Sequence, residues 1–585
     1  MLHTIIKKNS YQDSVNLMLL TNAVSVIEGV EKIQVMMGTP ANKDILSAAG
    51  LYTDELADAG ANDMCIVLDT DNEEKVDEVL AAVDEYLNNQ AISKSGNDFE
   101  TVRTFDKAMK TMPDANLAVI SVAGQYAANE ADKALDNGLN VFMFSDNVSF
   151  EDERRLKEKA HDKGLLVMGP DCGTGVISGI PIAFTNVVKE GNIGIVGASG
   201  TGIQEVTTII DRLGGGVVHA LGTGGRDLSD KIGAITMMDA IKALENHNPT
   251  EVITIISKPP AKEVRDRVVQ LLRSLSKPVV TIFLGEKPEK HEGNVYQAYT
   301  LEETARISVD LAKGNEIKED YNAVDVAVDN VQLTPEQTSI KGFYSGGTLG
   351  YEAATLLSDA LSLEKGKAAE GFLLQANGHE IADLGDDIYT QGKPHPMIDP
   401  DTRVNFMEKA ADDESTAVVL FDVVLGYGSH SDMAGALLPS IQRIKSNVEA
   451  KGRNVYFVAT VCGTEQDPQD YQDQRQKLEQ AGVIVRDSNN QAVRTALSII
   501  GLTVNDVKKQ HVEYTGEVAQ EDLSISPELD KLINSKPVVV NIGLKSFTEP
   551  VVKYGGRVVH YDWRPVAGGN ERMAKILNLL NSYSK

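Results

Sequence analysis

The pattern Gly-Thr-x-x-x-Glu occurs twice in this chain, each time directly after a short apolar run. The first copy covers residues 200–205 and follows the run 193–198. The second copy covers residues 347–352 and follows the run 342–344. Each copy predicts a β-strand, a turn of small residues and the N-terminus of a helix, because apolar runs favour strands while Gly, Ser and Thr favour turns and helix caps.

Backbone N–H groups at such a turn are suited to hold a small anion. The first N–H groups of a helix have no partner within the helix, and the helix dipole favours negative charge there. The predicted anion-binding residues of the two turns are Ser199, Gly200, Thr201, Ser345, Gly346, Gly347 and Thr348. The alternative is that these residues only cap their helices. Two such turns favour an enzyme that acts on small anions, with two related domains facing each other.

A second set of candidates lies on a proline-containing loop, residues 393–403. Because each proline restricts the backbone, the loop holds Lys393, His395 and Arg403 rigidly. We interpret Lys393 as an anion ligand and Arg403 as a bidentate clamp for phosphate or carboxylate. We interpret His395 as a general acid or base. A structural loop with surface charges is the alternative.

Three further residues follow predicted strands or turns. Asp387 lies at a turn after a strand and is interpreted as a group that orients or acts as a general acid. His430 follows the predicted strand 417–421. It is expected at the sheet edge that also holds the other candidates of this unit, and it is interpreted as catalytic. Arg226 follows a Leu-Gly turn and is interpreted as a phosphate ligand. A solvated turn, a helix cap or a structural histidine is the alternative in each case.

The loop 168–177 also follows a predicted strand end, where α/β folds place their ligands. Its residues Gly169, Pro170 and Cys172 are expected to line a pocket. Cys172 is interpreted as a small residue in a Gly-rich loop rather than a nucleophile, since no histidine lies near it in the sequence.

Composition excludes several classes of protein. The 585 residues include 56 basic and 85 acidic side chains, a net charge of −29, which argues against nucleic-acid binding. No apolar stretch approaches the ~20 residues of a membrane span. The three cysteines are too few and too scattered for a disulfide framework or a metal site, so no metal is expected. The N-terminus has no signal-peptide pattern, and we expect a cytoplasmic protein.

Alternating strand and helix patterns predict an α/β protein of several domains. A small α+β domain is expected at 1–95, a Rossmann-like domain at 115–190, and a short C-terminal α/β segment at 536–585. Between them, two related α/β units are expected at 191–313 and 338–502.

Several longer motifs carry a family resemblance. Residues 168–177, 194–201 and 347–353 resemble the α-subunit of succinyl-CoA synthetase, and 376–500 resembles the C-terminal domain of its β-subunit. The closer resemblance is to the FdrA family, a fused branch of the acyl-CoA synthetase superfamily. It rests on four runs, which are residues 383–387, 392–400, 461–468 and 562–569. The resemblance implies a CoA-binding-type Rossmann domain followed by two flavodoxin-like domains.

The chain departs from the synthetases in ways that affect chemistry. Those enzymes carry a phosphorylated histidine in Gly-His-Ala-Gly-Ala, whereas the matching segment here reads Gly-Glu-Lys-Pro-Glu-Lys-His, ending at His291. We expect His291 in an exposed polar loop outside any such motif. No ATP-grasp domain precedes residue 338 and no Gly-x-x-x-x-Gly-Lys-Ser/Thr loop is present, so a self-contained nucleotide-driven ligase is not expected.

The FdrA resemblance implies one subunit of a multi-protein oxamate carbamoyltransferase of allantoin breakdown. That reaction joins carbamoyl phosphate and oxamate to give oxalurate and phosphate, or runs in reverse. It requires partner subunits and no cofactor, and CoA binding is implied only by the resemblance. Two alternatives remain: an acyl-CoA synthetase component that needs a separate ATP-grasp subunit, and a non-enzymatic scaffold that senses CoA or a metabolite.

Overall fold

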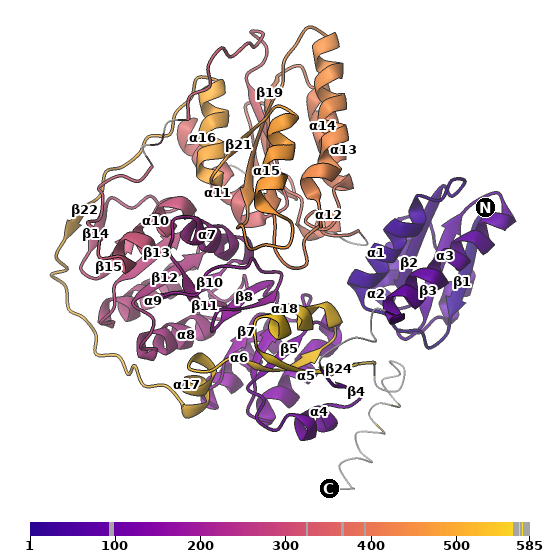
Figure 1. Cartoon of the computed structure of the whole chain (residues 1–585), viewed down its shortest axis with the longest axis horizontal. Helices are drawn as coiled ribbons and strands as arrows, with labels where there is room; N and C mark the ends of the chain where they lie inside the picture. The colour runs from indigo at the N-terminus through magenta and orange to yellow at the C-terminus, as the bar shows by residue number, and fades with distance from the viewer. Residues whose placement is uncertain are drawn as a thin grey trace.

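The computed structural model describes residues 1–92, 99–322, 324, 326–363, 368–390, 393–565, 573 and 576. Within this part of the chain the strands form one three-stranded, one nine-stranded and two six-stranded sheets, flanked by helices. This arrangement confirms the predicted α/β class with a small N-terminal domain (Figure 1). No helix in the described part is long and apolar enough to span a bilayer.

The N-terminal domain is an antiparallel sheet covered on both faces. Its strands are ordered β1-β3-β2, with bounds Leu2–Lys7, Met64–Asp69 and Lys32–Met37. Helices α1 (Ser14–Ser25) and α3 (Glu73–Ile92) share one apolar cluster with the sheet, and α2 (Pro40–Ala48) shares the other. This domain lies beside the rest of the molecule in Figure 1.

Tyr11 and Asn22 of the N-terminal domain contact the body. Tyr11 packs edge-on against Trp563 with ring centroids 5.6 Å apart, and Trp563 also packs against Tyr126 at 5.1 Å. On the other side, the Asn22 amide donates to the Asp399 carboxylate over 2.5 Å. Trp563 is 4% exposed, so it packs inside the contact between the N-terminal domain and the body.

The Rossmann-like sheet combines strands from distant parts of the chain. Its order is β4-β24-β23-β5-β6-β7, and all of its neighbours run parallel. The strands are β4 (Thr101–Val102), β5 (Leu117–Ile120), β6 (Asn140–Met143), β7 (Val167–Met168), β23 (Val538–Ile542) and β24 (Arg557–Tyr561). The predicted segment 536–585 therefore does not stand apart, because β23 covers the otherwise open edge of the buried strand β5. Residues 566–572, 574–575 and 577–585 of that segment lie outside the described residues.

The helices around this sheet come from both ends of the chain as well. They are α4 (Phe105–Thr111), α5 (Gly124–Asp136), α6 (Phe150–Asp162), α17 (Pro527–Ile533) and α18 (Thr548–Lys553). The loop after β7 leads directly into a hairpin of the next sheet.

The nine-stranded sheet holds the first Gly-Thr turn. Its order is β22-β14-β15-β13-β12-β10-β11-β8-β9. The strands are β8 (Thr174–Ile177), β9 (Ile180–Ala183), β10 (Ile193–Ala198), β11 (Val217–Gly222), β12 (Val252–Ser257), β13 (Val279–Phe283), β14 (Lys290–Glu292), β15 (Val295–Gln297) and β22 (Gln510–Val512). The flanking helices are α7 (Gly200–Arg212), α8 (Ile235–Asn246), α9 (Lys262–Ser274) and α10 (Leu301–Ala312). The β8–β9 hairpin, which was predicted within 115–190, pairs with β11 and belongs to this sheet.

The second six-stranded sheet holds the second Gly-Thr turn and has the order β17-β18-β16-β19-β20-β21. The strands are β16 (Ser339–Tyr344), β17 (Phe372–Ala376), β18 (His379–Asp383), β19 (Thr416–Val424), β20 (Tyr456–Cys462) and β21 (Val483–Arg486). The helices are α11 (Gly347–Ala360), α12 (Asp387–Thr390), α13 (Asp401–Asp412), α14 (Met433–Ala450), α15 (Tyr471–Gln480) and α16 (Asn489–Ile499). In both of these units the motif helix follows the strand at which the strand order reverses, the place where α/β sheets bind ligands.

The two units share one core, in which each motif glutamate caps a helix of the other unit. Ile203 and Val206 of α7 and Leu349 and Ala353 of α11 belong to the same apolar cluster. Glu205 accepts from the backbone N–H that opens α16, at Asn489, over 2.8 Å.

The second glutamate mirrors the first. Glu352 accepts from the backbone N–H of Leu301, which opens α10, over 2.7 Å, and from the Asn489 side-chain amide over 2.8 Å. Both glutamates are fully buried or nearly so, and burial raises the pKa of Glu352 to about 7. The repeated Gly-Thr-x-x-x-Glu pattern thus builds a reciprocal junction between the two halves.

Replacing Glu352 by alanine should weaken this junction. Two buried donors would lose their acceptor, which lowers the free energy of unfolding by about 2 kcal/mol. The midpoint of urea unfolding of the full chain measures this, with Glu263→Ala on an exposed turn of α9 as the matched control. Equal midpoints for the two variants would contradict the capping role.

Candidate functional site

The two Gly-Thr turns touch each other. The hydroxyl of Ser199, the N-cap of α7, lies 2.6 Å from the hydroxyl of Thr348 in the first turn of α11. The Thr348 backbone N–H donates to the Thr201 hydroxyl over 3.3 Å. The sequence predicts one anion site at each turn, but the two turns meet at one point, where the N-termini of two helices converge.

An internal carboxylate already occupies part of the second turn. Asp422, on β19 and fully buried, accepts from the backbone N–H groups of Ser345 and Gly346 over 2.8 and 2.7 Å. It also accepts from the Ser345 hydroxyl over 3.0 Å. These two N–H groups hold the protein's own anion, which corrects their interpretation as ligand donors. Of the first turn, Gly200 and Thr201 are only partly buried.

Arg403 supports this internal anion and is not a substrate clamp. Its side chain is fully buried on α13, where one guanidinium nitrogen donates to the Asp422 backbone carbonyl and another to the Pro396 carbonyl over 3.0 Å. The guanidinium lies 3.6 Å from the Asp422 carboxylate. The predicted clamp for a bound anion is therefore wrong, because no face of Arg403 reaches solvent.

Carboxylates from separate domains gather near the paired turns. Asp146 follows β6, Asp171 follows β7, and Asp387 opens α12. Asp171 is exposed at its surface, but the protein atoms crowded around its carboxyl partly desolvate it and raise its pKa to about 6; the charges of Asp146 and Asp387 raise it further while Lys258 and Arg226 oppose the shift. Carboxyl groups after two strands of the Rossmann-like sheet therefore lie within electrostatic reach of Asp387 in the second flavodoxin-like domain.

Asp383, the last residue of β18, lies against the start of α11. A Cβ added to Gly347 would come within 2.3 Å of its carboxylate, and its other oxygen accepts from the Gly385 N–H over 3.1 Å. Burial raises the pKa of Asp383 to about 6, a shift that the charge of Lys258 opposes. A carboxyl group that titrates near neutral pH is suited to move a proton.

Sequence reasoning missed Asp171, Asp383, Asp422 and Lys258. Three of these residues share a signal, since Asp383 ends a strand and Asp171 and Lys258 lie just after one. Asp422 carries no such signal, because it lies within a continuous apolar strand.

His395 lies against Gly385, which also contacts Asp383. Its Nδ1 accepts from the Met397 N–H over 3.2 Å, and a Cβ added to Gly385 would come within 2.7 Å of its Nε2. Burial lowers the pKa of His395 to about 4, so the imidazole is neutral at pH 7. Lys393 is exposed at the start of the same loop.

His430 contacts residues near the N-terminal domain rather than the paired Gly-Thr turns. Its Nδ1 accepts from the Asp432 N–H over 2.9 Å, and its backbone N–H donates to the Met397 carbonyl over 2.9 Å. The carboxylate that it influences is Asp399, which contacts the N-terminal domain. The structure does not bring His430 together with the paired turns.

Arg226 and the loop after β7 make mainly structural contacts. Arg226 pairs with Glu153 over 2.8 Å, donates to the Val148 carbonyl over 2.8 Å, and stacks on the Phe150 ring at 4.4 Å. These partners occupy the guanidinium that the sequence assigns to a ligand.

The loop itself packs against the turn after β11. The Pro170 carbonyl and Gly169 lie against Gly224, and the Cys172 sulfur lies against Gly222. Burial raises the pKa of the Cys172 thiol to about 12, which fits the interpretation of Cys172 as a packing residue.

His291 is buried, contrary to the expected exposed loop. It lies on β14 at 1% exposure, where its Nδ1 accepts from the Gln297 N–H over 3.0 Å and its ring packs on Tyr296. Burial lowers its pKa to about 4. The apolar packing between β14, β15 and β22 was not evident from the polar sequence around it.

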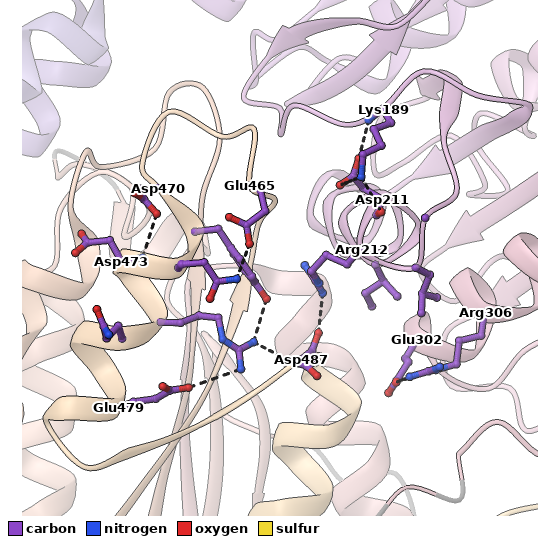
Figure 2. A pocket seen from close by; sticks show the side chains of 17 residues that line it. Lys189, Asp211, Arg212, Glu302, Arg306, Glu465, Asp470, Asp473, Glu479 and Asp487 are labelled. Atoms are coloured by element: carbon purple, nitrogen blue, oxygen red, sulfur yellow. Dashed lines mark hydrogen bonds and ion pairs between the residues drawn. The ribbon is translucent and has the colours of Figure 1, made fainter.

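A cavity of about 1020 Å³ opens between α7 and α15. It lies at the C-terminal end of α7, whereas the first Gly-Thr turn is at the N-terminal end. Figure 2 shows Arg306 beside Glu302, with which it pairs over 2.7 Å. Arg475, which also lines the cavity, pairs with Asp487 over 2.6 Å. The negative end of the α7 dipole faces this cavity, so it is not suited to the anions expected at the other end.

Three family models match the chain. The model described as "AllF, heavy metal-associated domain" covers residues 1–103, "CoA binding domain" covers 188–285 and "CoA-ligase" covers 343–499. The CoA-binding match thus falls on β10–β13 rather than on 115–190, where the resemblance implied a CoA-type pocket. The protein YahF of Escherichia coli (strain K12) is 42% identical over 496 residues, which are 83% of this chain and 96% of YahF.

The chain belongs to the FdrA/AllF family. Its scaffold is similar to that of succinyl-CoA synthetase: the α-subunit 2 of succinate–CoA ligase from Archaeoglobus fulgidus is 26% identical over 199 residues, 33% of this chain and 67% of that protein. An acetyl-coenzyme A synthetase of Ca. Korarchaeum cryptofilum covers 66% of this chain and 83% of its own at 15% identity, with a TM-score of 0.27.

The domain name of the first match implies a heavy metal, but the residues of this FdrA/AllF chain do not fit one. Its N-terminal domain contains a single cysteine, Cys65, which is fully buried on β3, and burial raises the pKa of this thiol to about 11. Among the described residues, no group of three or more His, Cys, Asp or Glu side chains is arranged to hold a metal ion.

The raised pKa of Asp383 predicts a pH dependence of stability. Between about pH 4 and 6 the folded protein keeps a proton that the unfolded chain loses, so stability falls as pH rises and then levels off. Asp383→Asn removes this component. Its unfolding free energy should rise relative to the parent by about 2 kcal/mol across this window. Parallel stability profiles of the two proteins from pH 4 to 8 would show that Asp383 has an ordinary pKa.

Proposed function

We propose that this chain is a subunit of a multi-protein oxamate carbamoyltransferase of allantoin breakdown, which joins carbamoyl phosphate and oxamate to give oxalurate and phosphate or runs in reverse. The observation that carries the proposal is the meeting of two helix N-termini beside Asp171 and Asp383, carboxyls that titrate near pH 6. Membership of the FdrA/AllF family supports it.

The chemistry that this site must support is a single acyl transfer. The oxamate nitrogen attacks the carbonyl carbon of carbamoyl phosphate, the carbon–oxygen bond to phosphate breaks, and the nitrogen loses one proton. In this proposal the backbone donors at Gly200 and Thr201 hold an anionic group, and Asp383 or Asp171 accepts the proton. No bound nucleotide or metal is required for these steps.

Partner subunits belong to the proposal. The charges of Asp146 and Asp387 act on Asp171, and those of Asp386 and Asp422 act on Asp383, whereas both substrates are anions. We propose that partner chains supply additional positive charge, so that activity requires the complex. We further propose a cytoplasmic location, which the three free cysteines support.

The second candidate is an acyl-CoA synthetase component that works with a separate ATP-grasp subunit. The matches to CoA-binding and CoA-ligase models favour it at a coarse level. The burial of His291 on β14 counts against it, because a phosphoryl relay needs an accessible imidazole. The resemblance to CoA-dependent enzymes is the one support for a CoA site.

Co-expression with partner subunits followed by purification and assay tests the proposal. The complex should release phosphate from carbamoyl phosphate only when oxamate is present, and His291→Gln should keep this activity because His291 takes no part in it. ATP- and CoA-dependent acyl transfer with a labelled phosphohistidine, and no oxamate-dependent release, would assign the protein to the ligase branch instead.

A further inference from the structure

His395 offers one hydrogen-bond donor whose position on the ring is fixed by the backbone. The Met397 N–H donates to its Nδ1 over 3.2 Å, so Nδ1 is the nitrogen without a proton in the neutral imidazole. The proton of the neutral ring therefore lies on Nε2. Burial lowers the pKa of His395 to about 4, which keeps the ring in this form at neutral pH.

Asp383 offers an acceptor at the same place. A Cβ added to Gly385 would lie 2.7 Å from the Nε2 of His395 and 3.3 Å from the Oδ1 of Asp383. The two atoms are therefore no farther apart than the sum of these distances, about 6 Å. Within the described part of the chain, no hydrogen bond joins them and Nε2 has no hydrogen-bond partner. Two hydrogen bonds of about 2.8 Å each would span such a gap through one bridging group.

Gly385 leaves the space beside these two atoms open. A side chain at position 385 would enter the space that both atoms border, and it would also meet the Ser345 carbonyl oxygen at 3.0 Å. Asp383, Gly385 and His395 are all partly exposed, so a small molecule can reach the donor and the acceptor. The place therefore combines one donor, one acceptor and access from solvent.

We infer that His395 and Asp383 form a recognition subsite for a carboxamide group. An amide carries an N–H donor and a carbonyl acceptor on neighbouring atoms, and the subsite offers a carboxylate acceptor and an imidazole donor. The amide N–H donates to Asp383, and the amide carbonyl oxygen accepts from the Nε2–H of His395.

This inference deepens the proposed function and rests on it for the identity of the amide, which is oxamate. It selects Asp383 over Asp171 as the group that takes the proton from the attacking nitrogen. The Asp383 carboxylate becomes a carboxyl group in that step, while His395 keeps its proton and only orients the carbonyl.

The subsite should distinguish an amide from a carboxylate. Oxalate is close to oxamate in size but has an oxygen in place of the NH₂ group. Its second carboxylate would face Asp383 with no proton to donate, so two acceptors of like charge would be left opposite each other. A site that hydrogen-bonds a donor of its substrate rejects an analogue without that donor. The parent protein is therefore expected to bind oxamate more tightly than oxalate.

Titration calorimetry with oxamate and with oxalate tests the subsite, using the full chain and the purified complex at neutral pH. Asp383→Asn adds a donor, so the ratio of the two affinities should shift towards oxalate about tenfold or more. His395→Ala should weaken oxamate binding about tenfold, and His395→Gln, which keeps an N–H donor, should retain part of it. His161→Gln, exposed on α6 and paired with Asp239, is the matched control and should stay within about twofold of the parent.

The outcomes separate the subsite from the proposed reaction. An unchanged affinity ratio in a folded Asp383→Asn protein overturns the inference, as does a parent protein that does not bind oxamate. Shifted ratios without any carbamoyl transfer by the complex would leave the amide subsite standing and remove the proposed function. Oxamate-dependent transfer with an unchanged KM for oxamate in both Asp383→Asn and His395→Ala would remove the subsite alone.

Discussion

The reciprocal junction between the two flavodoxin-like units is the constraint on which the site depends. Each motif glutamate accepts from the first N–H of a helix in the other unit, and the hydroxyls of Ser199 and Thr348 touch at the N-termini of the helices that carry these glutamates. Because these partners are buried, neither unit can shift without leaving polar groups unpaired. The relative position of the two helix N-termini is therefore fixed by the same residues that form them.

Local sequence signals predicted much of the fold and part of the site. The strand–turn–helix at each Gly-Thr motif was readable, because small residues and apolar runs report local conformation. The pairing of β23 with β5 could not be predicted from local sequence, since it joins residues more than 400 positions apart. The sequence also did not predict which polar side chains are buried, since Arg403 and His291 are both enclosed. Lys258 was overlooked although it directly follows a strand.

Several structural features of the chain bear on its likeness to succinyl-CoA synthetase. The FdrA/AllF chain brings two helix N-termini together, encloses His291 on β14 between β22 and β15, and fills one turn with Asp422. A site with one open turn, one internal carboxylate and neighbouring acids that titrate near neutral pH suits proton-coupled transfer between small molecules. It is less suited to a phosphoryl relay, which needs both turns free around a charged imidazole.

A double-mutant cycle on phosphate binding tests most directly whether the two turns form one site. Ser199→Ala, Thr348→Val and the combined variant would each be titrated with inorganic phosphate at constant pH and salt. A single shared site predicts that the combined loss of binding free energy is smaller than the sum of the separate losses. Losses that simply add would show that each half binds its anion alone, which would contradict the account.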